Sequence, residues 1–132
     1  MQTRAAAIVA LLILGGCGQS AKPAGDGGQF AGLEAEILKW REEIVKSDLL
    51  CRTAGQKCVD FEVSCKAERT VTADDTAKGV TARVVAAMDW TGWDPKLKQS
   101  QMASATAEFT RARGAWTRTP HKPVNISTCA DQ

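Results

Sequence analysis

The chain has 132 residues, and its 17 basic and 15 acidic side chains leave a formal net charge of only +2. Charges of both signs are interspersed along the sequence, so neither nucleic acid nor an anionic surface is predicted as a partner. The length fits one small domain.

The first feature along the chain is an apolar run over residues 5–14, preceded by Arg4. This length suits a signal peptide and is too short to span a bilayer, which needs about 20 apolar residues. The run ends in Leu14-Gly15-Gly16-Cys17, which resembles the lipobox of bacterial lipoproteins. The resemblance implies removal of residues 1–16, acylation of Cys17 and attachment to the cell-envelope membrane. Because Gly18 follows the cysteine instead of Asp, it further implies the outer membrane, facing the periplasm.

Residues 17–29 are predicted to form the lipidated cysteine and a flexible tether, because they are rich in small and polar residues without apolar periodicity. Residues 30–132 are predicted to fold as a single domain. An amphipathic helix is expected at its N-terminus, over residues 30–50. The apolar side chains that recur there at helical spacing are Phe30, Leu33, Ile37, Trp40 and Ile44. This stripe requires another element to pack against.

Four strands are predicted to follow. Apolar and polar side chains alternate from Val59 to Val71, which is typical of a strand with one core face. Residues 79–91 alternate too but also fit a helix that begins at Thr72; Gly79 and the valines favour the strand. Alternation returns over residues 102–113, and a turn leads into a short last strand at 115–119. The predicted fold is α+β, with the helix packed on a four-stranded antiparallel meander.

This order of elements resembles cystatin-like and NTF2-like domains. The segment from Phe109 to Trp116 is similar to the closing hairpin of many NTF2-like chains, in which a strand, a glycine turn and a tryptophan recur. NTF2-like domains open with more helix than this chain offers. Neither resemblance carries a catalytic residue across.

The cysteines after Cys17 are even in number, which in an exported domain predicts two disulfides. They are Cys51, Cys58, Cys65 and Cys129. If a strand begins at residue 58, about 23 Å separates positions 58 and 65, too far for a disulfide, whose Cα atoms lie within about 7 Å. Two pairings remain open: 51–58 with 65–129, which we favour, and 51–65 with 58–129. The spacings are too wide for a zinc knuckle, so no metal site is predicted.

No catalytic residue or cofactor is predicted. The chain has a single histidine, His121, in an expected loop, and a Cys/His or Ser/His/Asp apparatus would have to use that one imidazole. G-x-S-x-G, P-loop and H-E-x-x-H motifs are absent from the sequence. The chain is therefore predicted not to be an enzyme.

Tryptophans beside carboxylates form the candidate binding site. Asp89 and Asp94 bracket the segment from Trp90 to Trp93. An aromatic ring stacks on the apolar face of a sugar while a carboxylate accepts from its hydroxyls, so this pattern indicates glycan or protein binding. Trp116 would extend the surface if the meander brings it next to Trp93. In the alternative interpretation, Trp90 belongs to the core and Trp93 covers a sheet edge.

The end of the domain is locally basic, and its charges either are solvated or form the rim of that site. They are Arg111, Arg113, Arg118 and Lys122. The sequence thus predicts a lipid-anchored envelope protein that binds or scaffolds another envelope protein or a peptidoglycan-type glycan. The alternative hypothesis is an inhibitor, immunity or exclusion lipoprotein that blocks an incoming enzyme or machinery.

Overall fold

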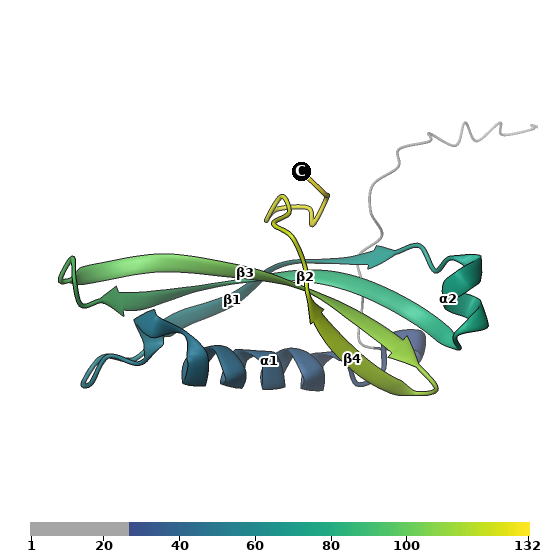
Figure 1. Ribbon diagram of the computed structural model, residues 1–132, viewed down its shortest axis with the longest axis horizontal. Helices are drawn as coiled ribbons and strands as arrows, with labels where there is room; N and C mark the ends of the chain where they lie inside the picture. Colours follow the sequence, from purple (N-terminus) through teal and green to yellow (C-terminus); the bar gives the residue numbers. More distant parts are fainter. Residues whose placement is uncertain (1–26) are drawn as a thin grey trace, which may run out of the picture.

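The computed structural model describes residues 27–132. The predicted signal peptide, Cys17 and most of the predicted tether lie outside the described residues. The described chain has an α+β fold in which one long helix packs on a four-stranded antiparallel sheet of order β1-β2-β3-β4 (Figure 1). The predicted fold class, with its meander topology, is confirmed at this level.

The long helix, α1, runs from Leu33 to Ser47 and follows a short 3-10 turn, η1, at Gly28–Phe30. Gly32 precedes it with φ of 86°, a conformation that glycine adopts without strain. At the other end, the Asp48 side chain accepts a hydrogen bond from the Leu50 N–H and starts a second 3-10 turn, η2. The helix is therefore shorter than the expected range of 30–50, because Gly32 and Asp48 bound it. It also does not lie at the N-terminus of the chain.

The strands and the remaining short helices complete the domain. Their bounds are η2 Leu49–Cys51, β1 Val59–Arg69, α2 Ala73–Ala77, β2 Val80–Asp94, β3 Gln99–Ala112 and β4 Ala115–Pro120. Thr72 and Asp75 form a capping box that begins α2. The segment for which sequence left helix and strand open therefore contains both, a one-turn helix and then β2.

The main core lies between α1 and the face of the sheet that it covers, here called the helix face. Trp40 of α1 meets Phe109 of β3 edge to face, with ring centroids 5.8 Å apart. Phe61 of β1 stacks on Trp90 of β2 at 5.9 Å. Other buried members of this core are Phe30, Leu33, Ile37, Ile44, Ala82, Val84, Ala86, Met88 and Ala107. Even-numbered residues of β2 therefore point to the helix face.

Strand β1 does not keep a single face towards the core, contrary to the alternation in its sequence. Val63 pairs with Met88 and Cys65 with Ala87, so Ser64 is an extra residue in the ladder, a β-bulge. Before the bulge, Val63 packs on the helix face; after it, Cys65 packs on the opposite face. The prediction of one core face was wrong because the bulge shifts the alternation by one residue.

The face of the sheet opposite α1, here called the far face, is partly covered by the C-terminal tail, residues 121–132. Cys129 is bonded to Cys65, and Val124 is buried with Val85 and Ala87 of β2. The Arg69 guanidinium donates to the Cys129 carbonyl at 2.5 Å. The second disulfide joins Cys51 to Cys58 between η2 and β1. The favoured pairing is thus the one in the structure.

Candidate functional site

The part of the far face that the tail leaves uncovered is the candidate site, and we call it the open face. It comprises Asp89, Thr91 and Trp93 of β2, Ser100, Met102 and Ser104 of β3, and Val59 of β1. Val59, Thr91 and Met102 form one row across three strands. Met102 is 75% exposed and Val59 50% exposed, while Trp93 is half-buried. Apolar side chains that gather on a surface in this way are typical of a contact site.

Asp89 lies on the same face of β2 as Trp93, about 13 Å along the strand. It pairs with Glu62 of β1 and Ser104 of β3. Its Oδ1 atom is buried and has no hydrogen-bond partner among the described residues. Because buried carboxylate oxygens are nearly always partnered, this unused acceptor on the open face is unusual.

Asp94 has a structural task instead. Its Oδ1 accepts hydrogen bonds from the backbone N–H groups of Lys96 at 2.8 Å and Leu97 at 3.0 Å. These bonds close the turn between β2 and β3, as Asp side chains do in many turns. By strand alternation Asp94 also points away from the open face, unlike its neighbour Trp93.

Trp116 is far from Trp93 and does not extend its surface, which corrects the expectation from sequence. The two tryptophans pair with residues 111 and 100 of β3, about 36 Å apart along that strand. Trp116 also lies on the helix face, where its Nε1–H donates to the Ala31 carbonyl at 2.9 Å and its ring lies against Gly32. Strand register, which the sequence pattern does not encode, separates them.

The basic residues near Trp116 share this separation from the open face. Arg111 donates to the carbonyls of Gly28 at 3.3 Å and Gln29 at 2.9 Å. Arg118 forms an ion pair with Glu43 of α1. These arginines fasten η1 and α1 to the sheet; Arg113 and Lys122 remain exposed. The predicted basic rim therefore does not surround Trp93.

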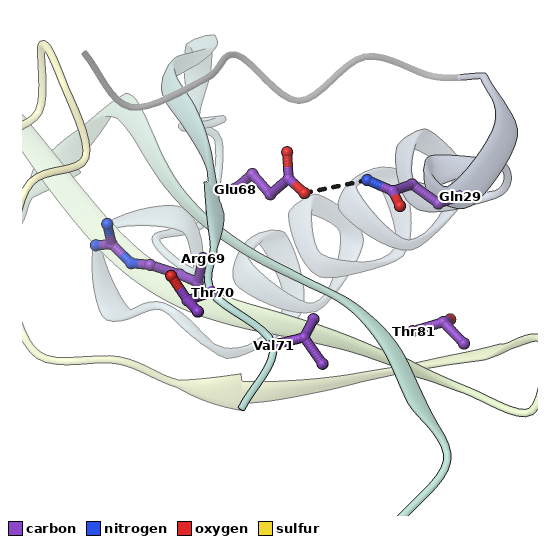
Figure 2. A pocket seen from close by; sticks show the side chains of 6 residues that line it. All are labelled: Gln29, Glu68, Arg69, Thr70, Val71 and Thr81. Atoms are coloured by element: carbon purple, nitrogen blue, oxygen red, sulfur yellow. Dashed lines mark hydrogen bonds between the residues drawn. The ribbon is translucent and has the colours of Figure 1, made fainter. Parts of the chain in front are cut away.

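Among the hollows on the described surface, two lie close to residues already discussed. The larger, of about 340 Å³, is lined by Gln29, Glu68, Arg69, Thr70, Val71 and Thr81. Figure 2 shows Glu68 and Gln29 pointing towards each other, while the Arg69 side chain points in another direction. The Gln29 Nε2 donates to the Glu68 Oε1 at 3.1 Å, and the Arg69 guanidinium binds the Cys129 carbonyl and Asp131. The smaller, of about 110 Å³, lies between α1 and β1, where Arg41 covers the Phe61 ring at 4.7 Å. The charged groups of the larger hollow are already paired, so it offers no acid/base couple.

An ion-pair network fastens α2 to the sheet. Arg83 of β2 contacts Glu108 of β3 at 2.7 Å and Asp75 at 3.1 Å. Hydrogen bonds from Thr72, and then the Arg83 charge, lower the pKa of Asp75. The hydrogen bond to Glu108 raises the pKa of Arg83. Both shifts come from this structural network.

Within residues 27–132, no group of three or more His, Cys, Asp or Glu side chains is placed to hold a metal ion. Among the helices described, none is long and apolar enough to cross a membrane. All four cysteines of the described chain are paired in disulfides.

No family model, curated protein or solved structure matches this chain. The exposure of Met102 and Val59 on one face of the sheet makes the open face the candidate site.

Proposed function

We propose that the chain is a lipid-anchored protein of the bacterial cell envelope that binds or scaffolds another envelope component through its open face. The observation that carries the proposal is a half-covered sheet: the tail buries Val85 and Ala87, while Met102 and Val59 beside Trp93 stay exposed. Apolar side chains on a flat sheet are stabilised when a partner removes them from water.

Two further observations support the envelope setting. The Leu14–Cys17 segment resembles a lipobox, and paired cysteines are compatible with an oxidising compartment such as the periplasm. The described chain begins beside Arg111 of β3, whereas the open face extends towards the turn between β2 and β3, at the other end of the sheet (Figure 1). A domain tethered at its first residues by a lipid would hold the open face away from its attachment point.

The chemistry of the open face favours a protein partner. Met and Trp are enriched at the centres of protein interfaces, and Met102 adapts its shape to an apolar neighbour. Asp89 and Trp93 share this face about 13 Å apart along β2, a spacing that an extended glycan would span and a single sugar would not. Peptidoglycan is therefore the second partner to test, after an envelope protein.

A photo-crosslinking amino acid at Thr91, in the centre of the open face, tests the proposal in cells that produce the full chain. A matched probe replaces Glu42, which is exposed on α1. We expect the probe at position 91 to yield a discrete adduct that Trp93→Ala removes, while the probe at position 42 yields none. Adducts of equal intensity from both probes, or none from either, would contradict the proposal. Binding of the purified chain to peptidoglycan sacculi, lost in the same Trp93 variant, would identify a glycan partner.

The inhibitor hypothesis has its own readout. Cells without the gene would become sensitive to neighbouring cells that deliver the target enzyme or machinery, and would show no envelope defect in pure culture. Sensitivity to detergent in pure culture would instead support the binding or scaffolding role.

A further inference from the structure

Strand β3 has an outer edge that is only half paired. β4 pairs with β3 over residues 107–112, and the last backbone contact on this side is from the His121 N–H to the Thr106 carbonyl, at 3.0 Å. The tail then leaves the strand for the far face. Over residues 99–105, β3 has β2 on one side and no strand of the described chain on the other (Figure 1).

The alternation of an antiparallel strand identifies which backbone groups this edge presents. The N–H and C=O of one residue point to the same side, and the side alternates along the strand. The Thr106 carbonyl points outward, since it accepts from His121, and the β2–β3 register is uninterrupted from Arg111 to Gln99. Ser100, Met102 and Ser104 therefore point their N–H and C=O groups outward. Their side chains all belong to the open face.

The edge carries none of the features by which natural sheets prevent pairing between edges. Residues 99–105 read Gln-Ser-Gln-Met-Ala-Ser-Ala and contain no charge and no proline, and the pairing of this segment with β2 has no bulge. The outer edge of β1, by contrast, is interrupted by two register shifts, contains Asp60 with φ of 56° and bears charged side chains such as Lys66. Of these two edges in the described chain, the β3 edge is the one suited to strand addition.

We propose that two copies of this chain pair edge to edge through residues 99–105, antiparallel, with Met102 on the two-fold axis. In this register each Met102 exchanges N–H and C=O hydrogen bonds with its counterpart, and each Ser100 does so with Ser104 of the second copy. All outward groups are then satisfied, and the two sheets become one. The proposal stands independently of the function proposed above.

Length and charge both point to a second copy as the occupant. With Met102 opposite itself, Gln99 of one copy lies opposite Ala105 of the other. In one copy, Lys98 has a φ of 52° and turns the chain away from the edge. This is the position opposite Thr106 of the other copy, where the free edge ends because the Thr106 carbonyl is already bonded to the His121 N–H. Each copy therefore leaves the shared edge at the point where the free edge of the other copy ends. No like charges oppose one another across the axis, and Met102, 75% exposed, gains an apolar neighbour.

Sedimentation equilibrium of the full chain in density-matched detergent tests the pairing, with Ser104→Pro and Ser104→Ala as a matched pair. Proline removes the outward N–H of residue 104 and none of the groups that bond to β2, so the sheet persists. Alanine keeps the N–H. We expect dimers for the original chain and Ser104→Ala, and a dissociation constant raised about tenfold or more for Ser104→Pro. Met102→Lys, which places two like charges at the axis and keeps every backbone group, should weaken the dimer similarly.

Circular dichroism of each variant establishes that the sheet is intact before its mass is interpreted. A chain that is monomeric at all concentrations would overturn the proposal, and so would a folded Ser104→Pro variant that dimerises as strongly as Ser104→Ala. In membranes, Met102→Cys should form a reducible dimer on oxidation with copper phenanthroline, while Leu38→Cys, exposed on α1, should not. Equal cross-linking of both variants would also overturn it.

Discussion

Cys65 and Cys129 lie 64 residues apart in the sequence, and their disulfide brings the two Cα atoms to 5.6 Å. The bond places the C-terminal tail on the far face, where Val124 is buried beside Val85 and Ala87. Within the tail itself, the β-type pairing is limited to one isolated bridge, between Val124 and Asp131. The disulfide therefore fastens the tail over one part of the far face, while the part towards the turn between β2 and β3 remains open.

Replacing both of these cysteines, Cys65→Ala with Cys129→Ala, is expected to lower the free energy of unfolding by about 4 kcal/mol. The reason is the loop entropy that the long cross-link removes from the unfolded chain. Urea unfolding followed by circular dichroism measures the loss. Binding of a dye specific for exposed apolar surface should rise, because the tail no longer holds Val85 and Ala87 out of water.

The Cys51–Cys58 disulfide provides the matched control, since its sequence separation is only 7. Replacing both of its cysteines by alanine should cost about 2 kcal/mol and leave dye binding low. Equal costs for the two pairs would show that loop length does not govern their contributions.

Most of the fold was predictable because its elements carry strong local patterns. The apolar stripe from Leu33 to Ile44 indicated α1, and alternation indicated four strands in meander order. Cys58 and Cys65 are not bonded to each other, as their spacing along one strand predicts, and each is paired with another cysteine.

The faces and registers were not predictable, and these decide the site. Ser64 has no feature that marks it as the bulged residue, yet the bulge moves Cys65 to the far face. Likewise, β2 and β3 extend far beyond the β3–β4 pairing, so Trp93 and Trp116 lie at opposite ends. Such relationships depend on which residues pair across strands, and local periodicity is the same in every register.

Trp93 and Trp116 should respond differently to replacement by alanine. Trp116→Ala removes the hydrogen bond to the Ala31 carbonyl and the packing on Gly32, so we expect a loss of about 2 kcal/mol in unfolding free energy. Trp93→Ala should change stability by less than about 0.5 kcal/mol and abolish the adduct at the open face. Thermal unfolding of both variants measures the contrast. A large destabilisation by Trp93→Ala would assign that ring to the core.

Acid should weaken the attachment of α2 through Asp75. Its pKa is lowered in the folded state, first by hydrogen bonds from Thr72 and then by Arg83. The ionised carboxylate therefore stabilises the fold at pH values above 3.8, the ordinary pKa of the group. That contribution disappears as the pH falls below 3.8 through the lowered pKa. Asp75→Asn should therefore show a flatter decline of stability between about pH 5 and pH 2 than the original chain. Urea unfolding at a series of pH values tests this, and parallel profiles would refute it.

Gly92 is the position where η2 approaches the sheet most closely. A Cβ atom added there would lie 2.4 Å from the Leu50 Cβ and 3.0 Å from the Leu50 carbonyl oxygen, and 3.1 Å from the Cys58 sulfur. Gly92→Ala should therefore push η2 off the sheet and cost about 1–3 kcal/mol of unfolding free energy. Thr91→Ala, on the adjacent open face, is the neutral control.

A double-mutant cycle separates this contact from a general effect of altering β2. The atom nearest to the added Cβ is the Leu50 Cβ, so Leu50→Gly should reduce the loss of unfolding free energy caused by Gly92→Ala. We expect a coupling free energy of about 0.5 kcal/mol or more between the two substitutions. Urea unfolding of the original chain, both single variants and the double variant measures the coupling. Strictly additive costs would show that η2 does not rest on Gly92 through Leu50.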